Sequence, residues 1–212
     1  GQKTYAQFTD SDPKVFTTPA GVRAFEILAK IRDYADPAAA NRAWNANSTL
    51  VMNHKAAFQF MGDWAKGEFI GAGKKLGAKG DVGCMLTPGT QDFYVMMGDV
   101  IAIPNGVKPE VLAQQKKLAE IVMSRDSQLK FSLAKGSIPF RTDIKAEGFD
   151  ECAALAMKVM AKPSAQVPGA AMAIRTEVSG TVTDAIAKYW STPSMTPQQG
   201  AEAAAAAMKR AL

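Results

Sequence analysis

The sequence of 212 residues predicts an α/β protein that is predominantly helical, with about three or four short strands. Apolar residues recur at helical spacing in several long segments, whereas alternating apolar and polar residues occur only in short runs. Many of the helical segments also begin at a capping residue and end at glycine or proline. So few strands cannot form a self-sufficient doubly wound sheet in a chain of this length. The chain is therefore expected to be part of something larger.

The first two predicted helices lie before residue 54. Thr18 is an N-cap candidate, and Pro19 follows it at the first helical position, where proline is favoured. An apolar stripe then continues until the helix is stopped by residues 36–37, Asp-Pro. A second helix is predicted over about 41–53, with Trp44 on its inward face.

The middle of the chain is predicted to hold the strands. Residues 56–60 alternate apolar and polar side chains, which is typical of a short strand. Gly62 permits a turn, and a helix is predicted over 63–75. The stretch 81–106 contains Pro-Gly and two further β-like runs on either side of Gly98.

The second half returns to helices. Gly136 has the character of a helix-ending glycine, and Thr196 begins a capping box with a proline and a glutamine. The stretch from Ile138 is expected to be extended because a proline follows it. Helices are predicted over 109–124, 127–134, 149–161, 176–190 and 196–212, with a loop over 163–168.

Composition excludes several functional classes. The net charge of +5 is scattered along the chain rather than gathered on a basic face, so nucleic-acid binding is not expected. No apolar run approaches the ~20 residues that span a bilayer, and the opening GQKTYAQFTD lacks the pattern of a signal peptide. The single histidine, His54, is expected to be exposed or capping. Neither a metal site, a cofactor nor a catalytic constellation is predicted.

Two cysteines, Cys84 and Cys152, are the only ones in the chain. Their spacing is compatible with one disulfide that closes a long loop, in an oxidising compartment, and equally with two buried free thiols. The residues alone leave both possibilities open.

Three segments, in order, resemble a known family. They are VMNHKAAFQFMGDWAKGEF, FYVMMGDVIAIPNGVKPEVLAQQKKLAEIVMS and SLAKGSIPFRTDI. Each is similar to a segment of the family-1 extracellular solute-binding proteins of bacterial ABC importers, and the glucose/mannose-binding branch is the most similar. The third segment, with its Lys-Gly-Ser-Ile-Pro-x-Arg-x-Asp pattern, is the most specific.

The resemblance implies a fold. It covers only about the carboxyl-terminal half of such a protein, so the chain is expected to be an incomplete, type II periplasmic-binding-protein-like lobe with few short strands. Residues 1–212 would be the carboxyl-terminal portion of a two-lobe protein. Hinge crossings are expected near 95–105 and 132–142, and about 100–130 would contribute to the other lobe. Relatives also imply that Cys84 and Cys152 are joined.

The resemblance further implies a function. The chain would belong to the substrate-binding component of an ABC sugar importer, which captures a mono- or small oligosaccharide between lobes without chemistry. Its expected location is the periplasm. Expected partners are the sugar, the membrane permease and the amino-terminal half of the same protein, with neither nucleic acid nor direct membrane insertion. The resemblance implies no enzyme activity.

The resemblance makes four residues candidate ligand contacts. Trp64 would stack on the apolar face of a sugar with Asp63 beside it, although a tryptophan can also serve only as core. Asp99 would accept hydrogen bonds from hydroxyl groups, unless it is simply a strand-end residue facing solvent. Lys135 would donate to hydroxyl groups, and otherwise it is an ordinary charge near a helix end.

One departure leaves the identity of the sugar open. The glucose-binding branch carries a histidine after the cysteine-bearing helix, and this sequence has KPSAQVPGAAMAIRTE there. Gln166 or Arg175 could take its place, and we include Arg175 among the predicted binding residues. Another saccharide or a polyol is therefore compatible with the sequence.

Two other functions remain as alternatives. A carbohydrate-active enzyme or a regulatory protein could share this lobe, and so could an isolated or engineered lobe that binds nothing by itself.

Overall fold

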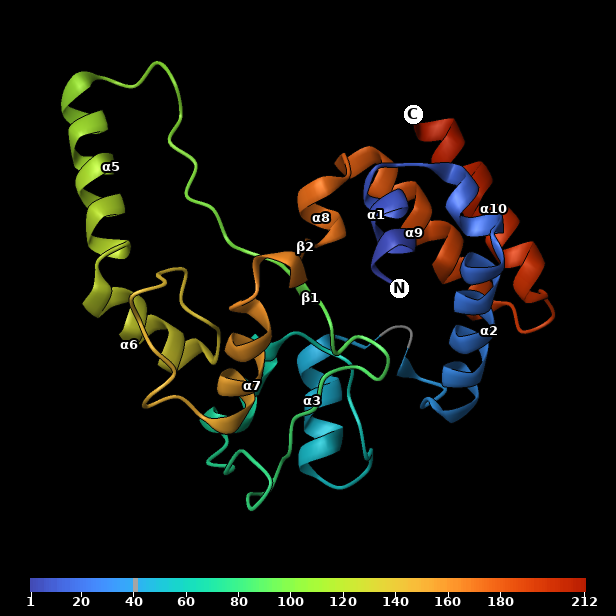
Figure 1. Cartoon of the computed structure of the whole chain (residues 1–212), viewed down its shortest axis with the longest axis horizontal. Helices are drawn as coiled ribbons and strands as arrows, with labels where there is room; N and C mark the ends of the chain where they lie inside the picture. Colours follow the sequence, from blue (N-terminus) through green and yellow to red (C-terminus); the bar gives the residue numbers. More distant parts are fainter. Residues whose placement is uncertain (40–41) are drawn as a thin grey trace. The chain divides into compact units, whose positions relative to one another are not determined.

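The computed structural model describes residues 1–39 and 42–212, and it is mostly helical, as the sequence predicts (Figure 1). The chain divides into two compact units. The first unit comprises Gly1–Arg42, Phe93–Met97 and Gln166–Leu212, and the second comprises Ala43–Asp92 and Gly98–Ala165. Among the described residues, no helix is both long and apolar enough to cross a membrane.

Three helices form the body of the first unit. Helix α10 (Pro197–Ala211) packs along both α9 (Thr176–Ser191) and α2 (Pro19–Tyr34), as Figure 1 shows. The predicted caps are confirmed: Thr18 accepts the Gly21 amide hydrogen, and Thr196 forms a complete capping box. Shorter helices that the sequence did not predict also belong to this unit: α1 (Gln2–Thr9), the 3-10 helix η1 (Pro13–Thr17) and α8 (Ala170–Ala173).

Tyr189 lies at the centre of the first unit's core. Its ring is fully buried and packs edge-to-face on Phe25 with centroids 5.1 Å apart, and its hydroxyl donates to the Phe25 carbonyl. Gly200 of α10 faces the same ring, and a Cβ there would lie 2.5 Å from Tyr189 Cδ2. Ala201 and Ala204 are also fully buried, so small residues let α10 approach closely.

The two strands found among the described residues are short and parallel. Strand β1 (Tyr94–Met96) pairs with β2 (Gln166–Pro168), with Val95 opposite Val167. The loop predicted over 163–168 is thus wrong at its end, because three residues that include a proline carry no local strand signal. Their pairing is decided by a partner about seventy positions away.

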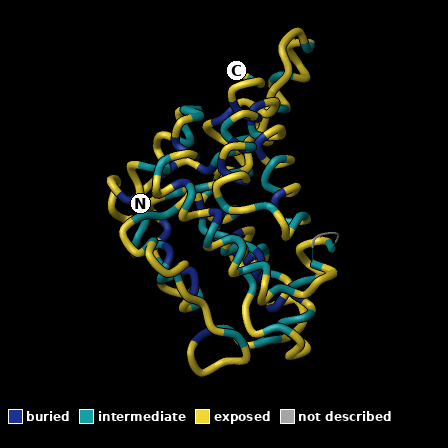
Figure 2. Tube along the Cα trace, turned by 90° about the vertical axis from the view of Figure 1, so that its right-hand side faces the viewer, coloured by how far each residue is buried: buried dark blue, intermediate teal, exposed yellow. Residues whose placement is uncertain are grey.

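The second unit contains short helices joined by long connections. Figure 2 shows its buried residues, and those of the first unit, as short dark-blue stretches between longer exposed ones. Its elements are α3 (Trp44–Met52), the 3-10 helix η3 (Asp63–Ala65), α4 (Lys66–Gly71), α5 (Pro109–Val122), α6 (Arg125–Lys135), α7 (Glu151–Met160) and the 3-10 helix η4 (Pro163–Ala165).

Three sequence predictions in this unit are corrected. Residues 56–60 form no strand, and Phe58 and Phe60 are 76% and 63% exposed. A strand needs a hydrogen-bonding neighbour, and no described segment pairs with this one. The β-like run after Gly98 is likewise not a strand. The helix predicted over 63–75 starts as a 3-10 turn and ends at Gly71. The start of the helix predicted over 41–53 falls partly outside the described residues.

The disulfide between Cys84 and Cys152 is present, which confirms the pairing that the resemblance implied. It ties the loop before β1 to the first turn of α7 across a separation of 68 residues. Closing a loop of that length in the unfolded chain stabilises the folded state by about 4 kcal/mol on the chain-entropy model.

Tyr189→Phe is expected to lower the free energy of unfolding by about 1 kcal/mol, because the change removes the buried hydrogen bond to Phe25 and keeps the ring. Tyr34→Phe is the matched control, since Tyr34 is 92% exposed. Urea denaturation of both variants measures the difference. Equal stabilities would show that the hydroxyl contributes nothing to this core.

Candidate functional site

The turn that carries Asp63 and Trp64 has a specific local shape. Gly62 is extended, and the Trp64 indole folds back over it, so that a Cβ at Gly62 would lie 2.4 Å from Trp64 Nε1. The indole also packs edge-to-face on Trp44, with centroids 4.9 Å apart. Both Asp63 and Trp64 are half-buried. The glycine is therefore what allows an aromatic ring to lie against its own turn.

A buried ion pair fixes the position of this turn. The ammonium of Lys66 lies 3.0 Å from the carboxylate of Asp150, and Lys66 is only 5% exposed. Asp150 is also the N-cap of α7 and accepts the Ala153 amide hydrogen. Burial raises the pKa of Asp150, but the Ala153 amide and the Lys66 ammonium lower it by more, so the net shift is downward.

A close backbone contact brings the predicted lysine to the same place. Gly67 lies against the end of α6, where a Cβ on Gly67 would be 2.5 Å from the Lys135 carbonyl oxygen. Gly136 ends α6 in the left-handed conformation, and its own Cβ would lie 2.8 Å from the Gly67 nitrogen. Only glycines permit this approach. Gly67 follows Trp64 by three positions, so the Lys135 backbone lies against the helix that directly follows the Asp63–Trp64 turn.

Asp99 joins the group through Lys135. The Lys135 ammonium donates to Asp99 Oδ2 at 2.5 Å, and it also lies over the Phe131 ring at 5.4 Å from the centroid. The preceding Gly98 packs under the Phe140 ring, where a Cβ would be 2.5 Å from Phe140 Cζ. Asp99 itself is largely exposed. Its carboxylate is therefore paired with Lys135 but remains open to solvent.

The rest of the Lys-Gly-Ser-Ile-Pro segment acts as a frame. Gln128, which is buried, accepts the Phe140 amide hydrogen and donates to the end of α5. Arg141 forms two parallel hydrogen bonds to Asp143, both at 2.8 Å, and a third to the Met123 carbonyl. The two hydrogen bonds from Arg141 and its positive charge lower the pKa of the Asp143 carboxyl. The frame holds the chain after Lys135 against α5 and α6.

The assembled group has the chemistry of a binding site for a polyhydroxylated ligand. Carboxylates at Asp63 and Asp99 accept hydrogen bonds, the Lys135 ammonium donates them, and the Trp64 indole offers an apolar surface. An exposed ion pair such as Asp99–Lys135 contributes only about 0–1 kcal/mol to stability. Its two partners can therefore turn to ligand hydroxyls at little cost. Among the described residues no three metal-ligating side chains cluster, and His54 is exposed.

Arg175 has a different setting from the other four predicted residues. It belongs to the first unit, where it is the N-cap residue of α9. Its guanidinium donates to the carbonyls of Ala211 and Leu212 at the end of α10. Gln166 lies in the same unit, in strand β2. The second unit thus gathers Asp63, Trp64, Asp99 and Lys135, and the role of Arg175 stays a prediction.

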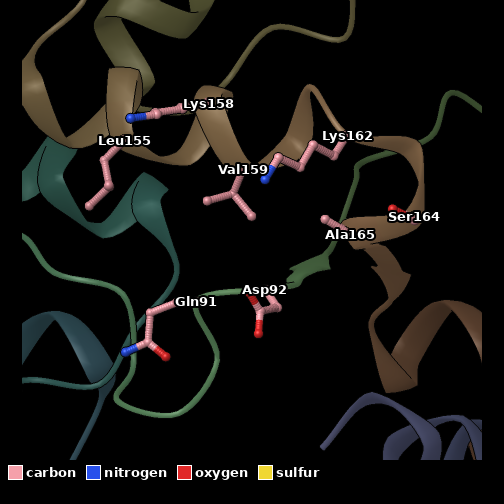
Figure 3. A pocket seen from close by; sticks show the side chains of 8 residues that line it. All are labelled: Gln91, Asp92, Leu155, Lys158, Val159, Lys162, Ser164 and Ala165. Atoms are coloured by element: carbon pink, nitrogen blue, oxygen red, sulfur yellow. The ribbon is translucent and has the colours of Figure 1, made fainter.

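A hollow of about 430 Å³ lies elsewhere in the second unit (Figure 3). Leu155, Lys158 and Val159 from α7 line one side, and Gln91 and Asp92 come from the loop opposite. Its remaining lining residues are Lys162, Ser164 and Ala165. The hollow has no aromatic ring and its lysines are exposed, so it lacks the combination found around Trp64.

Sequence reasoning missed the residues that hold the site together. Lys66 has no signal of its own, since a lysine in the first turn of a helix is ordinarily exposed. Asp150 lies in the first turn of the helix predicted over 149–161, and as an aspartate it carried an N-cap signal that could have been recognised. Gly67 and Trp44 become significant only through contacts with distant residues.

The family to which the chain belongs is that of the bacterial extracellular solute-binding proteins. The family's sequence model matches residues 3–158, which includes the Asp63–Trp64 turn, Asp99 and Lys135. The family predicted from the three segments is therefore confirmed.

Individual proteins are also similar to this chain. A protein of Brucella suis named "probable sugar-binding periplasmic protein" is 40% identical over 145 residues, which are 68% of this chain and 34% of that protein. A protein of the same name from Rhizobium meliloti is 37% identical over 163 residues, or 76% and 39%. A xylose/arabinose-binding protein of Haloferax volcanii is 31% identical over 147 residues, or 68% and 30%. The chain thus matches between 30% and 39% of the length of these curated relatives.

Asp150→Asn is expected to lower the free energy of unfolding by about 3 kcal/mol, because it leaves the buried Lys66 ammonium without a counter-charge. Asparagine is itself a good N-cap, so the change isolates the charge. Asp126→Asn is the control, because the Asp126–Lys130 pair is about three-quarters exposed on both sides and should cost about 0.5 kcal/mol or less. Equal effects in urea denaturation would contradict a structural role for the buried pair.

The same pair predicts a pH dependence. Because folding lowers the pKa of Asp150, its stabilisation is complete above the ordinary carboxyl pKa and is lost as the pH falls through the lower, folded-state value. The acid limb of stability against pH should therefore be shallower in Asp150→Asn than in the wild type.

Proposed function

We propose that this chain is the carboxyl-terminal portion of the substrate-binding component of an ABC sugar importer. It would bind a mono- or small oligosaccharide without chemistry, in the periplasm, and deliver it to a membrane permease. The observation that carries the proposal is the grouping of Trp64, Asp63, Asp99 and Lys135 in one unit by the Gly67–Gly136 contact. The names of the relatives, which mention sugar binding, support the ligand class.

The proposed mechanism is capture by differential affinity. A sugar stacks its apolar C–H face on Trp64 while its hydroxyls exchange hydrogen bonds with Asp99 and Lys135. The lobes of the complete protein close around the ligand only to the extent that the closed state binds it more tightly. Contacts from polypeptide outside this chain supply part of that difference. The isolated chain is therefore expected to bind sugar weakly.

Exposed apolar surface in the second unit supports the proposal that further polypeptide completes the fold. The run 100–103, Val-Ile-Ala-Ile, has the continuous apolar composition that is typical of a strand buried on both faces. In the structure, however, Val100 is 86% exposed and Ile101 is 51% exposed. Within the described residues its backbone forms no hydrogen bond (extended trace before α5 in Figure 1). Helix α5, which follows, buries no residue, and its exposed apolar side chains are Val111, Leu118 and Ile121.

We therefore propose that residues 98–122 form a β–α unit whose strand joins a sheet supplied by polypeptide corresponding to the rest of the relatives. The chain matches only 34% and 39% of two of them, so they contain ample additional polypeptide. A strand of four residues, each adding about 3.3 Å, is long enough to pair with a neighbouring strand along its whole length. This assignment agrees with the expected contribution of about 100–130 to another lobe.

Sugar titration tests the proposed function. Calorimetry with a panel of mono- and disaccharides would be run on this chain and on a longer polypeptide that carries it. The longer polypeptide should bind at least one sugar, and Trp64→Ala should weaken that binding by about 2 kcal/mol, roughly thirty-fold. Trp190→Ala, in the first unit, is the control and should bind as the wild type does. Tight binding by the isolated chain, or no loss with Trp64→Ala, would contradict the proposal.

Hydrogen exchange tests the proposed strand. In the isolated chain, the amides of Val100, Ile101 and Ala102 should exchange nearly as fast as in an unfolded chain. In the longer polypeptide they should become protected, because a neighbouring strand would accept their hydrogens. Amides within α10 serve as an internal reference and should be protected in both. Fast exchange at 100–102 in the longer polypeptide would exclude the strand.

A further inference from the structure

Trp44 begins helix α3 and lies next to the proposed sugar platform. Its indole and that of Trp64 have centroids 4.9 Å apart and planes at 89°, so the pair forms two walls that meet nearly at a right angle. The sequence predicted Trp44 on an inward face, yet 37% of it is exposed. Trp44 therefore belongs to the exposed large apolar side chains of the second unit and leaves part of its ring open beside Trp64.

A polar network holds Trp44 in this position. The Ser48 hydroxyl, which is fully buried, donates to Gln59 Oε1 at 2.9 Å, and Gln59 Nε2 donates to the Trp44 carbonyl at 3.0 Å. The network ties the first turn of α3 to the segment that leads into the Trp64 turn. Buried polar groups specify a unique arrangement when their hydrogen bonds are satisfied. Here the buried Ser48 and the half-buried Gln59 hold the Trp44 carbonyl beside the segment that leads to Trp64.

We propose that Trp44 is a ligand-contacting residue and forms the second aromatic wall of the site. This inference rests on the proposed function. A pyranose that stacks its C–H face on one indole would direct the C–H bonds of a substituent at its ring edge toward the other. The exocyclic CH2 of a hexose's hydroxymethyl group supplies such C–H bonds, and a pentose of the same ring configuration lacks it. The right-angled pair therefore favours hexoses, and Trp44 contributes to that selectivity.

The test compares sugars that differ only by this group: D-glucose with D-xylose, and D-galactose with L-arabinose. The longer polypeptide and its Trp44→Ala variant would be titrated with both pairs. Affinity for the bound hexose should fall about tenfold, the size expected when a small apolar contact is lost, while affinity for the pentose changes much less. Trp190→Ala, the control, should change neither.

Each other outcome has a definite meaning. Equal losses for hexose and pentose would show that Trp44 only supports Trp64, and no loss would show that it contacts no ligand; both overturn the inference and leave the proposed function intact. Absence of sugar binding by the wild type would overturn the proposed function and this inference with it.

Circular dichroism of this chain checks the arrangement without a ligand. Two indoles at this separation and angle should give a paired positive and negative band that disappears in both Trp44→Phe and Trp64→Phe. The band should remain in Trp190→Phe. Its survival in Trp44→Phe would contradict the paired geometry, and thermal melts of the variants would confirm that each is folded.

Discussion

The buried Lys66 ammonium is the constraint on which the arrangement of the second unit depends. A charge that is 5% exposed needs a counter-charge at hydrogen-bonding distance, and Asp150 supplies it. Because Asp150 also caps α7, the start of that helix cannot move independently of the Asp63–Trp64 turn. The disulfide at Cys152, two residues further along α7, adds a covalent tie to the loop that contains Cys84. One helix terminus therefore joins three segments that are distant in the sequence.

Close contacts at three glycines bring segments of the candidate site together. At Gly67 and Gly136 two backbones approach too closely for any side chain, which brings the end of α6 to the first turn of α4. At Gly98 an aromatic ring occupies the space where a Cβ would be, which holds the adjacent acid near Lys135. The predicted contact residues Asp99 and Trp64 lie at the edge of these contacts, and neither is buried. Rigid support behind accessible polar groups is the arrangement that binding without chemistry requires.

Sequence patterns located the helices well where start and stop signals were local. The Thr18 and Thr196 caps and the glycine after Lys135 all appear in the structure as predicted. The strands were predicted poorly, since pairing depends on partners elsewhere in the chain. Residues 56–60 have the alternation of a strand and no neighbour, whereas 166–168 lack the pattern and yet pair with β1. Local propensity is a weak guide to strands for this reason.

The sequence by itself determined the family, the mostly helical character, the disulfide partners through the resemblance, and four residues that the second unit places near one another. Each of these rests on residue types in a fixed local order, which survives without knowledge of contacts. Only the tertiary structure decided that Lys66 is buried against Asp150, that Gly67 meets Gly136, and that Trp44 stands perpendicular to Trp64. These contacts join residues far apart in the chain, and their energies depend on burial and geometry that no local pattern encodes.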